Sequence, residues 1–189
     1  RTAAAQGNAP TLAWNPNQAG EFVAVYKDDS SSSASMYWYI GTVSGNTVTQ
    51  GTTYLATGLA HDGCGVAWNK GVTDEFAFIY RTHSGGITNI CRGINSSGAI
   101  SYGTPTVLDS SNNGFRPNIS FDNNVTGSFV WQYYGITDTE SKSGAGTLSG
   151  DTWTIGATQV TPDSDASSLN YLSPIHFSQT TAGVGAGCW

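Results

Sequence analysis

Pairs of apolar residues recur along the chain at a nearly constant interval. The first members of successive pairs are separated by 54, 53 and 56 residues. Self-similarity at a fixed period of this length indicates copies of one supersecondary unit that stack or fan out. The chain is therefore predicted to be a repeat protein. The four pairs are Leu12 and Trp14, Val66 and Trp68, Ile119 and Phe121, and Ile175 and Phe177.

Each complete copy contains four short runs that are typical of β-strands. The runs are rich in β-branched and aromatic residues and are separated by turns of Gly, Asn, Asp and Ser. The second run is apolar on both faces, as at Phe22 and Val23, so we expect it to be covered on both sides. Small antiparallel sheets packed face to face around an axis produce this pattern, and four strands per repeat are typical of a β-propeller.

The anchor, the turn after it, the run FVAVY at 22–26 and a third run similar to YIGTVSG resemble the blades of secreted β-propellers. Those proteins include lectins and sialidase-like or glycosidase-like propellers. The resemblance covers nearly all of the chain and implies an all-β, propeller-like array of four-stranded antiparallel blades. A β-sandwich with accidental regularity is the alternative. The expected organisation is a flexible lead-in at 1–9 and a single domain at 10–189, with about three and a half blades at 10–57, 64–109, 117–161 and, in part, 173–189.

The fourth copy is expected to contain only two strands, the second of which would present an unpaired edge. Exposed edges recruit other strands. We therefore expect either a fragment of a longer propeller or completion by copies of this chain or by another chain. Two copies would close a ring, whereas addition of 1–9 to the edge of the next copy would build a filament. The edge residues are Gly183, Val184, Cys188 and Trp189.

Composition favours an extracellular protein. Charged residues make up only 11% of the chain, Gly is abundant, and the net charge is −6. An acidic chain without a basic run argues against nucleic-acid binding, and no apolar stretch approaches the length of a membrane span. We expect a secreted protein, and the start at Arg1 suggests a processed N-terminus.

The predicted inner strands offer no catalytic pair of carboxylates. They contain TLAW, GVAW, NISF and PIHF, whereas glycosidases use two placed carboxylates. Asp122 follows the third anchor, but it aligns with Asn15 and Asn69 and so is expected to serve a repeated turn. Neither the ligand spacing of a metal site nor a Ser-His-Asp arrangement is recognisable. We predict no catalytic residue, metal or cofactor, and keep a glycosidase-like enzyme as the less favoured function.

Glycan binding is the favoured function, and its candidate residues are those that depart from the repeat. Trp14 and Trp68 repeat and are expected in the core. Trp38 aligns with polar residues at 89 and 143, and Tyr134 lies just beyond the second run of the third copy. His176 replaces small residues of the other inner strands. The predicted ligand-binding residues are therefore Trp38, Tyr134 and His176, with inter-blade packing or hydrogen bonding as the alternative for each.

Three glycosylation sequons and three cysteines complete the candidates. Asn95 and Asn124 lie in predicted turns, where a glycan could project, whereas Asn118 is expected to be more buried. Cys64 and Cys91 are separated by one strand, which places them too far apart for a disulfide, so we expect buried thiols. An intermolecular bridge through Cys188 is the alternative.

Overall fold

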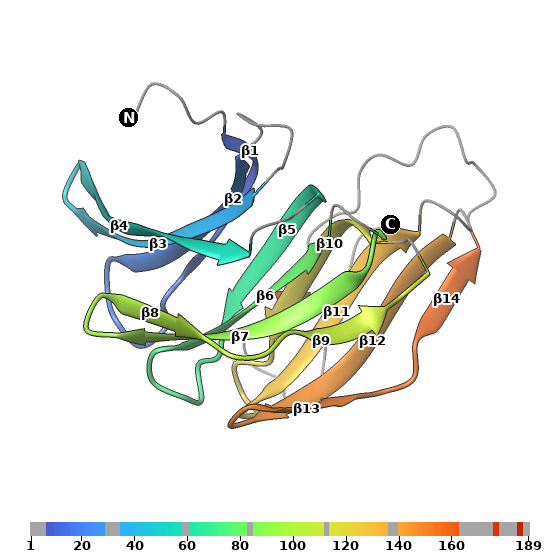
Figure 1. The fold of residues 1–189 in the computed structure, drawn as a ribbon. Coiled ribbons are helices and arrows are strands. Elements are labelled where there is room, and N and C mark those ends of the chain that lie inside the picture. The colour runs from blue at the N-terminus through green and yellow to red at the C-terminus, as the bar shows by residue number, and fades with distance from the viewer. Residues whose placement is uncertain are drawn as a thin grey trace.

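The computed structural model describes residues 7–28, 35–57, 61–82, 85–111, 114–135, 140–162, 176–177 and 185–186. These residues form an all-β fold of antiparallel sheets that lie face to face along the chain (Figure 1). Each of the three large sheets contains a four-stranded meander in sequence order. The three predicted four-stranded units correspond to these three sheets.

The first sheet contains β1 (Gly7–Trp14), β2 (Glu21–Asp28), β3 (Ser35–Ser44) and β4 (Thr47–Thr57). The second contains β5 (His61–Trp68), β6 (Glu75–Arg81), β7 (Thr88–Ser96) and β8 (Ala99–Tyr102), and β9 (Thr106–Asp109) also pairs with β7. The third contains β10 (Phe115–Phe121), β11 (Ser128–Gly135), β12 (Glu140–Ser149) and β13 (Thr152–Ile155), and β14 (Gln159–Pro162) also pairs with β12. A short pair, β15 (His176–Phe177) and β16 (Gly185–Ala186), follows.

The turn between the first and second strands is the same in each sheet. The residue after the first strand donates its backbone N–H to the start of the second strand: Asn15 to Glu21, Asn69 to Glu75, and Asp122 to Ser128. Its side-chain oxygen also accepts a backbone N–H two residues ahead, at 2.9 Å in the first turn and 2.8 Å in the third. Asx turns of this kind fix the chain reversal locally. The predicted turn role of Asp122 is confirmed.

Two apolar cores hold the three sheets together. The first core lies between the first and second sheets and includes Val25, Trp38 and Phe78. The second lies between the second and third sheets and includes Ile90 and Trp131. Inner strands β1, β5 and β10 contact one another in that order, and β15 contacts β10. The second strand of the second sheet, β6, is therefore covered on both faces, as its apolar pattern predicts.

A phenylalanine faces a glycine at the same register in every sheet. The pairs are Phe22 with Gly41, Phe76 with Gly93, and Phe129 with Gly146. A Cβ atom at Gly93 would lie 2.4 Å from the Phe76 ring. The ring thus needs a neighbour without a side chain. These pairs align the three sheets residue by residue.

Candidate functional site

One face of the first sheet has no other described sheet against it. Side chains alternate across the sheet, so Val23 and Trp38 point into the first core while Trp14 and Tyr39 lie on the opposite side. On that side Leu12 is 57% exposed and Trp14 is 56% exposed. We call this side the open face, and it comprises Leu12, Trp14, Phe22, Tyr26, Tyr37, Tyr39, Thr53 and Leu55.

Aromatic rings of the open face form one connected row. Ring centroids are 5.5 Å apart for Trp14 and Phe22 and 6.0 Å apart for Phe22 and Tyr39. Tyr26 then lies 6.4 Å from Tyr39 and stacks with Tyr37 at 5.8 Å. Edge-to-face and offset contacts at these separations stabilise aromatic clusters. The row runs from β1 through β2 to β3.

Hydroxyl groups accompany the aromatic rings. Burial raises the pKa of Tyr26, and a hydrogen bond with Thr53 opposes this effect. The Thr53 hydroxyl also accepts a hydrogen bond from the side-chain amide of Gln50 at 2.9 Å. Tyrosines combine an apolar ring with a polar tip. The open face can therefore offer ring surfaces together with donors and acceptors to a ligand that needs both.

The burial of two tryptophans is the reverse of the prediction. Trp14 was expected in the core, and this prediction is wrong for the described structure. Trp38 was expected as a binding platform, but it is fully buried and packs against Phe76 and Phe78 at 5.3 Å and 4.7 Å. Its indole therefore offers no face to a ligand, and the assignment of Trp38 is also wrong.

A one-residue error in alignment accounts for one of the two polar matches of Trp38, whereas the match with Ser143 holds in the sheet register, where Ser143 pairs with Gln132. When the repeats are aligned by sequence, Trp38 corresponds to the polar residue Asn89. In the register of the sheets, Trp38 pairs with Val25, and the corresponding pair in the second sheet is Ile90 with Ile79. Because side chains alternate along a strand, a shift by one residue exchanges the two faces.

The other predicted binding residues are not brought together. Tyr134 is buried in β11 and pairs with Phe115 on β10, so little of its ring is available to a ligand. His176 lies in β15 and pairs with Ala186, and its side chain is outside the described part of the structure. The predicted edge residues also lie outside the described residues: Gly183, Val184, Cys188 and Trp189.

The three sequons differ in environment. Asn95 is 5% exposed, and its amide nitrogen donates to Glu21 Oε1 at 3.3 Å while its oxygen accepts the N–H of Gly98 at 3.0 Å. The side chain does not project from the turn as predicted, and its burial leaves little room for a glycan on that nitrogen in the folded protein. Asn124 is exposed in the turn between β10 and β11, and Asn118 is half-buried.

Cys64 and Cys91 are both buried, and neither forms a disulfide in the described structure. Tyr80 pairs with Cys64 and Phe78 pairs with Cys91, so strand β6 lies between the two thiols as expected. Burial raises the pKa of both thiols to about 12. They behave as small apolar side chains. Cys188 lies outside the described residues.

Arg116 was not identified from the sequence. It lies at a β-bulge in β10, adopts a φ of 49°, and places its guanidinium 5.0 Å from the centre of the Phe115 ring. The corresponding bulge in β5 has Gly63, with a φ of 100°. Non-glycine residues in this backbone region are strained and occur often at functional sites. An arginine in an inner strand where another copy has glycine is the signal that could have identified it.

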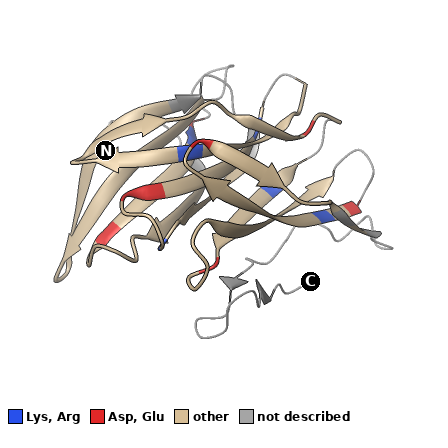
Figure 2. Ribbon diagram, turned by 90° about the horizontal axis from the view of Figure 1, so that it is seen from below, with Lys and Arg blue, Asp and Glu red and all other residues tan. Residues whose placement is uncertain are grey.

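Charged residues are sparse along the strands of the sheets (Figure 2). Among the described residues, no cluster of three His, Cys, Asp or Glu side chains is arranged to hold a metal. Within the same part of the chain, no helix has the length and hydropathy to cross a membrane.

Comparisons with known proteins relate the fold to sialidases. No protein-family model matches the chain, and no curated protein matches it in sequence. Among solved structures, the fold is similar to that of the Hadza microbial sialidase Hz136, with a TM-score of 0.56 at 12% sequence identity. The match covers 94% of this chain and 40% of the sialidase chain, so this chain spans less than half the length of that protein. The likeness concerns the fold alone: this is a sialidase-like, β-rich structure.

Proposed function

We propose that the protein is an extracellular, non-enzymatic carbohydrate-binding protein whose sheets are the blades of a propeller. The observation that supports this proposal is the open face, where Trp14 is more than half exposed beside Tyr26, Tyr37 and Tyr39. Exposed apolar patches of this kind mark interaction sites in soluble proteins. The similarity of the fold to a sialidase is consistent with a carbohydrate-related role.

Carbohydrate suits the chemistry of the open face. Sugar rings have apolar C–H faces that stack on aromatic rings, and hydroxyl rims that need hydrogen-bond partners. The row from Trp14 to Tyr37 provides aromatic rings for stacking. The phenol groups and Thr53 provide hydrogen-bond partners for the sugar hydroxyls. Catalysis is not part of the proposal, because the inner-strand segments TLAW, GVAW and NISF lack the two carboxylates that glycosidases use.

Two exposed aromatic residues provide a matched test. Trp14 lies on the open face, whereas Tyr102 is 51% exposed on the second sheet. In a glycan array followed by calorimetry, Trp14→Ala is expected to weaken binding at least tenfold, while Tyr102→Ala leaves it unchanged. Equal loss in both variants, or binding that survives Trp14→Ala, would contradict the proposal. Absence of binding to every glycan would exclude carbohydrate recognition.

A second function is favoured by a specific observation, namely that the residues corresponding to Trp14 are covered. Trp68 and Phe121 occupy its position in the other sheets, and both are buried against the preceding sheet. By this argument the open face would be covered by a sheet of another copy, and the protein would be a structural subunit of an extracellular oligomer or filament. Light scattering separates the alternatives: an oligomer that Trp14→Lys dissociates supports assembly, whereas a monomeric wild type contradicts it.

A further inference from the structure

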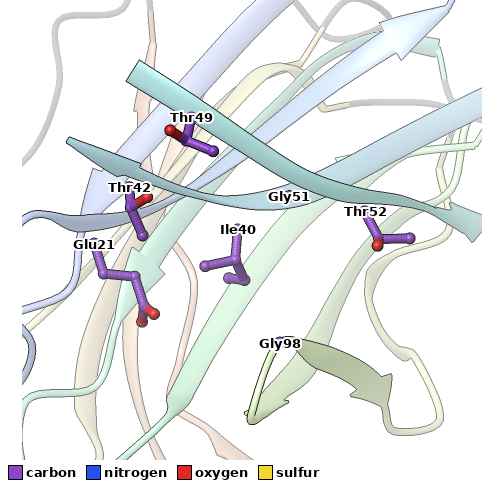
Figure 3. A pocket seen from close by; sticks show the side chains of 7 residues that line it. All are labelled: Glu21, Ile40, Thr42, Thr49, Gly51, Thr52 and Gly98. Carbon is purple, nitrogen blue, oxygen red and sulfur yellow. The ribbon is translucent and has the colours of Figure 1, made fainter. Parts of the chain in front are cut away.

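A cavity of about 210 Å³ lies between the first and second sheets, on the opposite side of the first sheet from the open face. Glu21, Ile40 and Thr42 of the first sheet and Gly98 of the second lie around it (Figure 3). Thr42 is exposed, so the cavity opens to solvent. The hydroxyl of Tyr54 donates to the Gly98 carbonyl at 3.0 Å and joins the two sheets beside it.

A buried carboxylate that has no cationic partner among the described residues lines the cavity. Glu21 is 6% exposed, and its Oε1 accepts hydrogen bonds from the side-chain amides of Asn15 at 2.7 Å and Asn95 at 3.3 Å. Both donors are neutral. Within the described residues, Glu21 Oε2 accepts no hydrogen bond and Glu21 forms no ion pair. Burying a charge is costly unless it is paired, so this carboxylate is poised to bind a cation.

The next interface along the chain shows which cation fits. Glu75 corresponds to Glu21 and is bonded in the same way through Oε1 by Asn69, at 2.5 Å. There, however, Arg92 Nε lies 2.5 Å from Glu75 Oε2, and another nitrogen of its guanidinium lies 2.7 Å from Asp151 Oδ1. Burial alone would lower the pKa of Arg92, but its bonds to Glu75 and Asp151 outweigh burial and raise it. A guanidinium thus fills this position between the second and third sheets.

The strand register identifies what changes between the two interfaces. Ile40 pairs with Val23, and Arg92 pairs with Ala77, so Ile40 occupies the position of Arg92. Gly98 likewise replaces Asp151 as the last residue of the turn before the fourth strand. The first interface therefore has neither the guanidinium nor the second carboxylate, but it has the carboxylate of Glu21 beside an open cavity.

We propose that this cavity binds a guanidinium group of a ligand or partner protein, with Glu21 Oε2 accepting its N–H groups as Glu75 Oε2 does for Arg92. The exposed hydroxyls of Thr42, Thr49 and Thr52 supply further acceptors at the rim. A planar guanidinium holds its N–H donors in fixed directions, so one can reach Glu21 Oε2 while others reach the rim, as Arg92 divides its donors between Glu75 and Asp151. One carboxylate matches one positive charge. This site is independent of the glycan-binding proposal for the open face.

Methylguanidinium is the probe, and N-methylurea is its neutral analogue of similar shape. Titration of the whole protein, followed by NMR chemical shifts of residues around the cavity, is expected to show saturable binding of methylguanidinium only. Glu21→Gln removes the charge and is expected to weaken binding at least tenfold. Ile40→Arg supplies the guanidinium from within and is expected to abolish binding. Glu140→Gln, on the third sheet, loses the same charge elsewhere and is expected to bind like the wild type.

Several outcomes would overturn the proposal. Equal binding of N-methylurea would show that charge is not recognised. Wild-type affinity in Glu21→Gln, or in a folded Ile40→Arg, would place the binding elsewhere, and a similar loss in Glu140→Gln would reduce it to a general effect of net charge. Because Ile40→Arg restores the pair seen at Arg92, it keeps the test decisive even if Glu21→Gln fails to fold.

Discussion

The indole nitrogen of Trp68 donates a hydrogen bond to the backbone oxygen of Ala13 at a distance of 2.9 Å. The bond joins the inner strands of the first and second sheets, β1 and β5. Trp68 is 4% exposed and packs on Phe76, whereas its counterpart Trp14 is 56% exposed. Two residues that the repeat makes equivalent therefore differ in what they contribute to the fold.

Substitution of each tryptophan by phenylalanine measures this difference. Trp68→Phe leaves the Ala13 carbonyl without its donor and opens a space in the first core, so the free energy of unfolding should fall by about 2 kcal/mol. Trp14→Phe changes an exposed ring and should stay within about 0.5 kcal/mol of the wild type. Urea unfolding followed by circular dichroism at low protein concentration gives both values. Equal losses would mean that Trp14 is as well packed as Trp68.

The repeat in the sequence predicted the fold better than it predicted the candidate site. Spacing from Trp14 to Trp68 to Phe121 predicted sheets of four antiparallel strands, because the apolar period is the same in each copy. The same regularity led to the wrong environment for Trp14, because an alignment of repeats assigns equivalent residues the same burial. The first sheet has no described sheet before it, and the burial of Trp14 depends on that neighbour.

The cavity at Glu21 was missed for a related reason. Its identification needs Ile40 to be matched with Arg92 and Gly98 with Asp151, and only the strand register gives those matches. Alignment by sequence placed the third strand of the second sheet one residue out of step. A single-residue offset leaves the number of strands unchanged, but it assigns the wrong face to every side chain of that strand.

The glycines beneath the phenylalanine rings lead to a second prediction. Gly93→Ala would place a Cβ atom 2.4 Å from the ring of Phe76, which is fully buried between two sheets and cannot move aside. Gly41→Ala creates the same clash with Phe22, which is 6% exposed but has no described sheet packed over its ring. Gly93→Ala should therefore lower the free energy of unfolding by about 3 kcal/mol, and Gly41→Ala by less. Thermal unfolding of both variants checks the order, and the reverse order would contradict the packing described for the open face.

Glycosylation distinguishes two of the sequons. When the protein is secreted from a glycosylating host, Asn124 should carry a glycan because it lies exposed in the turn after β10. Asn95 should remain unmodified because its amide nitrogen is buried against Glu21. Mass spectrometry of peptides before and after glycan removal reports both sites. A fully glycosylated Asn95 in folded protein would show that the turn between β7 and β8 is not packed as described.

Asp109 connects the second and third sheets and leads to a prediction about pH. Its Oδ2 accepts hydrogen bonds from the Tyr133 hydroxyl at 2.7 Å and from Lys142 Nζ at 3.2 Å, while Oδ1 accepts the backbone N–H of Ser111 at 2.7 Å. Burial alone would raise the pKa of Asp109, but the hydrogen bonds from Ser111, Tyr133 and Lys142 outweigh it and hold this pKa well below its usual range.

The lowered pKa of Asp109 determines the direction of the pH effect. An aspartate in the unfolded chain titrates near pH 3.9, so the stabilisation from the folded ion pair is complete above that pH. It is lost as the pH falls below 3.9 toward the folded-state pKa, because the unfolded chain takes up a proton first. At pH 7, Asp109→Asn should lower the free energy of unfolding by about 2 kcal/mol, since a charged hydrogen-bond acceptor is lost between the sheets. Urea unfolding of both proteins from pH 7 to pH 2 should show this difference shrinking at the acid end, and parallel profiles would contradict the role assigned to Asp109.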